Sequence, residues 1–113
     1  ASSNIQDNVV VHVSYDAATQ IGKGVTIGHS AIIHGCTIHD HALIGMGAIV
    51  LDKAVINTHV LIAAGSLVPP RKVCESGYLY MGSPAKKARA LTDDEITMIH
   101  ENADHYITNK SQL

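Results

Sequence analysis

The stretch Val25–Val50 reads VTIGHSAIIHGCTIHDHALIGMGAIV, and it brings an aliphatic residue round every six positions. One of these repeats, the one before Ile38, is a residue short. Outward from this stretch the same step covers Ile5–Val68, interrupted by four extra residues within Val11–Ile21. An amphipathic helix would repeat about every 3.6 positions, so the step of six argues against helices here. It predicts an all-β solenoid of hexapeptide repeats.

A small or β-branched residue stands two positions before each aliphatic one, as Ala31 does before Ile33 and Cys36 before Ile38. Because side chains alternate across a strand, both members of each pair point inward. Each hexad is then a short strand plus a corner, and three hexads make one triangular coil. Glycines follow several of the aliphatic residues, and we expect them at corners that need unusual backbone angles, namely Gly22, Gly28 and Gly45. So narrow a core leaves no room for aromatic rings, in keeping with an aromatic content of 4%.

The period-six pattern stops after Val68, at a pair of prolines. We predict solenoid coils over 1–75, a connector over 76–91 and a C-terminal helix over 92–109. The pattern starts within the first five residues of the sequence, with no polar coil before it to close the core. We therefore expect 1–113 to be a single domain that forms the C-terminal part of a longer β-helix protein.

The helix itself is predicted from about Asp93 to Thr108. Thr92 and Glu95 have the spacing of a capping box, in which each side chain bonds the backbone of the other residue. One helix face gathers the apolar residues and is expected to pack along the outside of the solenoid: Ile96, Ile99, Ala103 and Ile107.

Composition and charge exclude several functions. The net charge is −2 with histidine neutral, which gives no electrostatic basis for binding nucleic acid or an anionic membrane. No apolar run approaches the roughly 20 residues that span a bilayer, and no signal peptide is visible. Two cysteines are too few for a disulfide framework, so a cytoplasmic location is expected.

Eight histidines in 113 residues are the first indication of metal chemistry. His12 and His34 each follow an inward aliphatic residue, and they stack on the same face about 4.8 Å apart, pointing outward. Two imidazoles at that spacing can share one Zn²⁺ at about 2.0–2.1 Å each. His29 lies a strand earlier, too far to join them within one chain, but it could reach a site on a neighbouring subunit of a closed three-fold assembly.

The alternative is that all three are ordinary surface histidines. We expect the other five to be solvated surface groups, at corners or on the C-terminal helix: His39, His41, His59, His100 and His105.

Several segments resemble the γ-class carbonic anhydrase family, closest to its compact bacterial members. They are NIQDN at 4–8 followed by His12, IGHSAIIHGC at 27–36 with His29 and His34, IGMGA at 44–48 and MGSPAK at 81–86. The resemblance implies a left-handed parallel β-helix of hexapeptide repeats with one C-terminal α-helix. It also implies a homotrimer with one zinc at each subunit interface, held by His12 and His34 of one subunit and His29 of its neighbour.

The same resemblance implies roles for four further residues. Gln6 would hydrogen-bond near the metal-bound water with Asn4 and Asp7 in support, and Tyr106 matches a helix tyrosine that approaches the site. Tyr106 could equally pack the helix onto the solenoid. In the loop 13–20, where family members carry a proton-shuttle residue, only Asp16 is acidic. Cys36 lies beside His34 but belongs to the inward series, so we expect it in the core.

The activity implied is that of a lyase that hydrates CO₂ reversibly to bicarbonate. Three histidines leave the fourth zinc position open, and zinc lowers the pKa of a bound water to about 7, which provides hydroxide to attack CO₂. The metal is expected to be zinc, or another divalent ion such as iron or cobalt. Two alternatives remain open: a hexapeptide acyltransferase, which needs no metal, and a non-catalytic metal-binding trimer.

Overall fold

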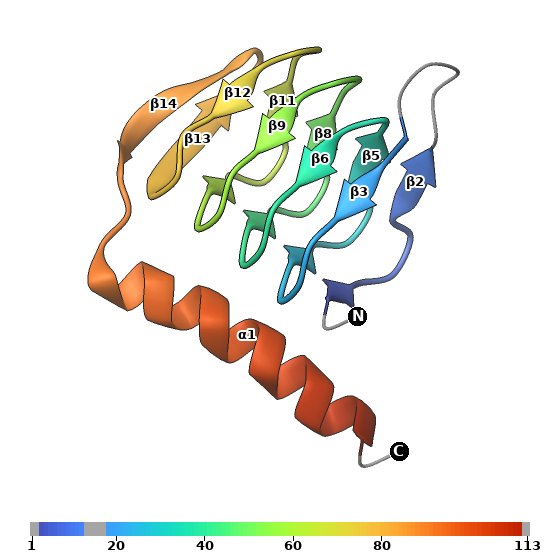
Figure 1. The fold of residues 1–113 in the computed structure, drawn as a ribbon, viewed down its shortest axis with the longest axis vertical. Coiled ribbons are helices and arrows are strands. Elements are labelled where there is room, and N and C mark those ends of the chain that lie inside the picture. Colours follow the sequence, from blue (N-terminus) through green and yellow to red (C-terminus); the bar gives the residue numbers. More distant parts are fainter. Residues whose placement is uncertain (1–2, 13–17, 112–113) are drawn as a thin grey trace.

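The computed structural model describes residues 3–12 and 18–111 and, within them, all side chains except those of Asn4, His12 and residues 103–111. These residues form the expected left-handed parallel β-helix, followed by a C-terminal helix, α1 (Asp93–Ser111) (Figure 1). The strands are short because each hexad turns a corner: β1 (Asn4–Ile5), β2 (Val10–His12), β3 (Gln20–Ile21), β4 (Thr26–Ile27), β5 (Ile32–His34), β6 (Thr37–Ile38), β7 (Leu43–Ile44), β8 (Ile49–Val50), β9 (Val55–Ile56), β10 (Leu61–Ile62), β11 (Leu67–Val68), β12 (Val73–Cys74), β13 (Tyr78–Gly82) and β14 (Ala85–Ala90).

Every third strand lies on the same face of the solenoid. One sheet has the order β1-β4-β7-β10-β13-β14, the second β11-β8-β5-β2 and the third β12-β9-β6-β3. The pairing between coils is parallel, and its register places equivalent residues on one another, as with Ile27, Ile44 and Ile62. Backbone N–H groups of one coil donate to carbonyls of the next, for example from Gly28 to Ile44 at 2.8 Å. This ladder satisfies the backbone polar groups along the solenoid.

The core consists of the inward pairs that the period-six pattern predicts. The aliphatic members from Ile27 to Val68 are at most 1% exposed, and so are their small partners Ala31, Cys36, Ala42, Ala48 and Ala54. The first coil differs, because Ile5 and Val11 are each 42% exposed. In the described residues no further coil lies over them.

The glycines that follow the aliphatic residues are needed for a different reason from the one we expected. Gly22, Gly28 and Gly45 do not have positive φ angles; the left-handed corners are at other positions, such as Gly47 and Gly65. A Cβ atom on Gly45 would lie 2.5 Å from the backbone nitrogen of Ala64 in the next coil. Close approach of successive coils, and not backbone conformation, therefore requires glycine after the aliphatic residue.

The solenoid continues beyond the point where the aliphatic pattern stops. Cys74 and Tyr80 occupy the next inward positions, at 0% and 2% exposure. The Tyr80 hydroxyl accepts a hydrogen bond from the backbone N–H of Glu75 at 2.8 Å, so a buried aromatic ring does fit at this end of the core. The segment predicted as a connector contains β13, which pairs with β10, and β14, which turns back antiparallel to β13.

The C-terminal helix begins as the sequence predicts. Glu95 N–H donates to the Thr92 hydroxyl at 3.1 Å, and Thr92 N–H donates to the Glu95 carboxylate at 2.9 Å, which completes the capping box. Figure 1 shows α1 running back along the coils toward the N-terminal end of the solenoid. Ile99 is fully buried, Ile96 is half-buried, and the side chains of Ala103 and Ile107 lie outside the described residues. No helix in the described part of the chain is long and apolar enough to span a membrane.

Candidate metal centre

The first two candidate ligands lie on adjacent strands of one sheet. His12 ends β2, His34 ends β5, and the two residues are direct partners in the parallel register. The inward residues Val11 and Ile33 pair just before them, so the backbone has the predicted stacking. The side chain of His12 lies outside the described residues.

The imidazole of His34 is held by a carboxylate from the next coil. Its Nδ1 atom is hydrogen-bonded to Oδ1 of Asp52, and both side chains are 37% exposed. Histidines that bind a metal through Nε2 commonly have Nδ1 fixed by a carboxylate in this way, which sets the tautomer and the ring orientation. The sequence interpretation missed Asp52, although its separation of 18 residues from His34 is one coil of the solenoid.

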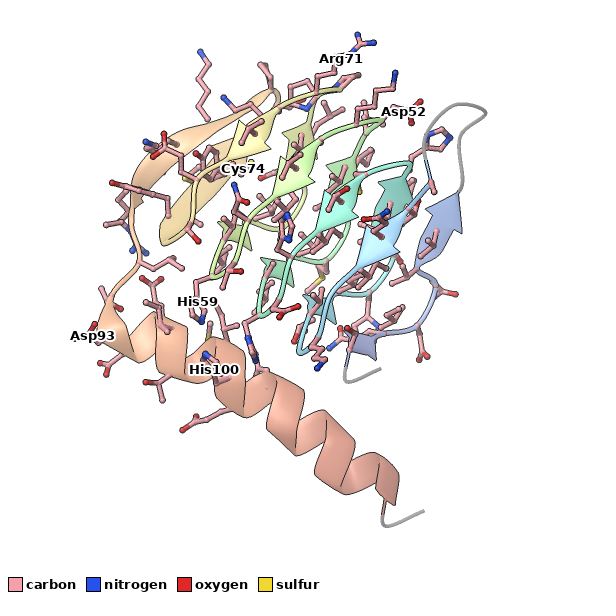
Figure 2. The ribbon with its side chains drawn as sticks, viewed as in Figure 1. Asp52, His59, Arg71, Cys74, Asp93 and His100 are labelled. Carbon is pink, nitrogen blue, oxygen red and sulfur yellow. The ribbon has the colours of Figure 1, made fainter. Side chains whose placement is uncertain are left out.

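A pocket of about 390 Å³ lies beside this pair, lined by His34, Leu51, Asp52, Lys53, Pro70 and Arg71. It is on the edge of the solenoid opposite α1, where Figure 2 labels Asp52 and Arg71. Lys53 and Arg71 are exposed cations that give this rim positive charge. A small anion would be attracted to such a rim.

The third candidate, His29, is an exposed corner residue after Gly28. Its carbonyl accepts a hydrogen bond from Gly47 N–H at 2.8 Å, which fixes the corner against the next coil. Among the described side chains, His29 does not belong to any group of three metal-ligating residues with ligand atoms within 4.8 Å of one another. Its pairing with His12 and His34 across subunits remains a prediction.

The residues expected to support the metal lie on or near the first strand. Gln6 is half-buried and its N–H donates to the Ile27 carbonyl at 3.0 Å, while Asp7 is exposed and its carbonyl accepts from Ser30 N–H. Asn4 pairs with Thr26 through the backbone, but its side chain lies outside the described residues.

Three further residues were considered for the site, namely Tyr106, Asp16 and Cys36, and the structure describes only the side chain of Cys36. Tyr106 is within α1 but its side chain is outside the described residues, and Asp16 is outside them altogether. Cys36 is buried, and burial raises the pKa of its thiol to about 11. A buried protonated thiol is a core group, as the inward series predicts.

The expectation for three of the other histidines was wrong. His41, His59 and His100 are half-buried and gather between the solenoid and α1, with ligand atoms within 4.8 Å of one another. Helix α1 packs over the corner that carries His41 and His59, and the hexapeptide pattern does not encode that contact. His39 is exposed as predicted, and the side chain of His105 lies outside the described residues.

Comparisons with known proteins agree with this architecture. The profile of the family described as bacterial transferase hexapeptide (six repeats) matches residues 35–70. The whole chain is 48% identical to the mitochondrial gamma carbonic anhydrase 2 of Arabidopsis thaliana, of which it spans 42%. It is 44% identical to Protein YrdA of Escherichia coli over 99% of the chain and 65% of that protein. Over its whole length the chain is thus similar to γ-class carbonic anhydrases among the hexapeptide-repeat proteins.

The fold of this chain is also similar to those of solved hexapeptide-repeat proteins. A hexapeptide transferase family protein from Anaplasma phagocytophilum is 46% identical and superposes with a TM-score of 0.93, over 98% of this chain and 65% of that one. AntD, an N-acyltransferase from Bacillus cereus, has a TM-score of 0.74 over 91% of this chain and 67% of that one, but only 16% identity. That second likeness concerns the fold alone.

Proposed function

We propose that this chain acts within a homotrimeric, zinc-dependent carbonic anhydrase that hydrates CO₂ reversibly to bicarbonate. Each zinc would be held by His12 and His34 of one subunit and by His29 of its neighbour. The observation that carries the proposal is the bond between His34 Nδ1 and Asp52, on a histidine that is in direct register with His12. Because the chain spans 42–65% of the relatives compared above, the activity of the whole protein belongs to this proposal.

The donor set fits zinc. Neighbouring parallel strands lie about 4.8 Å apart, a separation that two imidazole nitrogens can close to bind one ion at about 2.0–2.1 Å. Imidazole ligands also accept other divalent ions, iron and cobalt among them. When bound, a zinc with three histidines supplies Lewis acidity and lowers the pKa of its water to about 7.

Other residues of the chain would orient the reactants. Asp52 keeps the proton on Nδ1 of His34, so that Nε2 faces the metal. The amide of Gln6 offers both a donor and an acceptor to orient CO₂ or water, with Asn4, Asp7 and Tyr106 nearby in the family arrangement. Asp16 or a nearby histidine is the candidate to pass the released proton to solvent. Two free, buried cysteines, Cys36 and Cys74, suit a reducing compartment such as the cytoplasm.

A mixing experiment tests whether each metal site is shared between subunits. His12→Ala and His29→Ala homotrimers should each bind zinc poorly at the subunit interfaces, because each lacks one ligand at every interface. When the two variants are unfolded together and refolded, each mixed trimer has one interface with all three histidines. Random mixing should therefore restore about a quarter of the interface sites, measured as the zinc per trimer gained over the two homotrimers. No recovery, with exchange of subunits confirmed, would falsify the shared site.

A hexapeptide acyltransferase is the second candidate, because the 46% identical solved structure is that of a hexapeptide transferase family protein. The two functions make opposite predictions. A carbonic anhydrase should contain zinc, hydrate CO₂ and leave acetyl-coenzyme A unbound. Acetyl-coenzyme A binding by zinc-free protein would favour the transferase, and zinc binding without hydration would favour a non-catalytic trimer.

A further inference from the structure

A second histidine cluster lies at the junction of the solenoid and α1, away from the pocket at His34. The Nε2 atoms of His59 and His100 are 2.8 Å apart. The ring of His41 completes the group, with its centroid 4.1 Å from that of His100 and 5.8 Å from that of His59. Figure 2 shows His59 reaching from the edge of the solenoid toward His100 on the helix.

The solenoid builds two members of the cluster by repetition. Gly24, His41, His59 and Gly77 occupy one corner of successive coils, and all four have left-handed φ angles, of 65°, 58°, 54° and 85°. Histidine is among the non-glycine residues that enter this region most readily. Gly24 also leaves space for the neighbouring ring, because a Cβ atom there would lie 2.6 Å from Cδ2 of His41.

The third member comes from the helix. Ile99 is fully buried against the solenoid, and His100 follows it directly, so the docking of α1 turns His100 toward the histidine corner. The three groups are therefore brought together from two coils and one helix, which are far apart in sequence but fixed by packing.

We propose that His41, His59 and His100 form a second divalent metal site, suited to Zn²⁺, which fastens α1 to the solenoid. Three imidazoles with ligand atoms within 4.8 Å of one another match a three-histidine site with one open position. Tetrahedral zinc holds its nitrogens about 3.3 Å apart, so the Nε2 atoms of His59 and His100 need to separate by only about half an ångström. The half-buried rings leave the fourth position accessible to water.

The surroundings keep a ligand in its metal-binding form. Burial, and after it the nearby rings of His100 and His41, lower the pKa of His59. A lower pKa favours the neutral imidazole at pH 7, and neutral imidazole is the form that coordinates metal. Without a metal, the contact between the Nε2 atoms of His59 and His100 requires a proton on one of the two nitrogens, as in an N–H···N hydrogen bond. A bound cation would take the place of that proton.

The test is Co²⁺ binding to the full-length trimer after removal of metal by a chelator, followed by visible absorption and metal analysis. His59→Asn is the informative variant, since asparagine tolerates the left-handed backbone of this corner and is a poor ligand for such ions. His39→Asn is the matched control, because His39 is exposed and outside the cluster. His59→Asn should bind one Co²⁺ fewer per subunit than the wild type, and His39→Asn should bind the same number.

The His29→Ala background separates this site from the proposed catalytic one. In the His29→Ala variant, Co²⁺ should still bind to the cluster of His41, His59 and His100. Adding His59→Asn should weaken that binding by at least 10–100-fold, roughly the cost of losing a group that only supports a metal ligand. Should His29→Ala fail to form trimers, the difference of one ion between wild type and His59→Asn still decides the question, whether or not the catalytic site binds metal.

A structural readout completes the test. Bound Co²⁺ should slow hydrogen exchange of the α1 amides in the wild type and in His39→Asn, but not in His59→Asn. Equal Co²⁺ binding by wild type and His59→Asn would overturn the proposal. Metal binding that leaves exchange in α1 unchanged would overturn the fastening role.

Discussion

His34 and Asp52, one coil apart, are joined through Nδ1 of the imidazole and a carboxylate oxygen. The solenoid makes this contact possible, since β5 and β8 are paired neighbours and place the two residues at adjacent positions of the same edge. The ring of His34 is thus oriented by the protein before any metal binds. Such orientation reduces the entropy that a ligand loses on coordination.

Removal of the Asp52 carboxylate should therefore weaken zinc binding while leaving the fold intact. We expect Asp52→Ala to lower zinc affinity by about 10–100-fold, and Asp52→Asn, which keeps an acceptor oxygen, to have a smaller effect. Competition with a chromophoric chelator measures the affinity. Asp40→Asn is the control, because Asp40 is an exposed acid that accepts a bond from Lys23 N–H at another corner. Unchanged affinity in Asp52→Ala would show that the contact does not support a metal ligand.

Gln6→Ala should separate turnover from metal binding. The residue is proposed to orient a reactant and not to coordinate zinc, so the variant should hydrate CO₂ more slowly, by about tenfold or more, at unchanged zinc content. Stopped-flow hydration assays and metal analysis of the same preparation give the two quantities. Loss of zinc along with activity would instead assign Gln6 a structural role.

The contribution of Glu95, near the start of α1, to the stability of the folded protein should be lost at low pH. The Arg89 guanidinium, and after it the backbone N–H of Thr92, lower the pKa of the Glu95 carboxyl from 4.5 to about 2. A carboxyl whose pKa is lowered by folding stabilises the folded state above its ordinary pKa, and this contribution is lost as the pH falls from about 4.5 toward 2. Between pH 5 and 2, stability should therefore fall less in Glu95→Gln, which keeps the cap but loses the charge. Carboxyl titration by NMR provides the check, and a midpoint near 4.5 for Glu95 would contradict it.

The two cysteines should be inert in the folded protein. Burial raises the pKa of both thiols to about 11, so very little thiolate is present at pH 8. A thiol reagent such as iodoacetamide should therefore label neither Cys36 nor Cys74 in the native state, and both after unfolding in denaturant. Rapid labelling of Cys36 in native protein would exclude it from the core.

The sequence predicts the coils well because each inward position is repeated. An irregular hexad, such as the short one before Ile38, does not obscure the pattern, because its neighbours still define the register. It predicts the last coil poorly, because Pro69 and Pro70 interrupt the pattern and Tyr80 replaces the aliphatic residue. The contacts that build sites are harder still. Periodicity can place His41 and His59 at one corner, but it contains no information on where α1 docks and so cannot bring His100 to them.

The glycines offer a direct test of what spaces the coils. Gly45 and Gly65 lie near corners of adjacent coils but are constrained differently: a Cβ atom on Gly45 would lie 2.5 Å from the Ala64 backbone, whereas one on Gly65 would meet nothing within 4 Å. Gly65 instead has a φ angle of 71°, which alanine adopts at a cost of about 1–2 kcal/mol.

Gly45→Ala should therefore destabilise the protein more than Gly65→Ala does. The atoms that it would strike are backbone, which cannot rotate away, so the two coils must separate and weaken their ladder. We expect Gly45→Ala to lower the free energy of unfolding by about 3 kcal/mol, the upper part of the range for overpacking. Denaturant unfolding at one fixed protein concentration compares the two variants, since the stability of the proposed trimer depends on concentration. If Gly45→Ala destabilised the protein no more than Gly65→Ala does, the coils would be able to move apart at this point. The positive φ angle would then be the stronger reason for glycine.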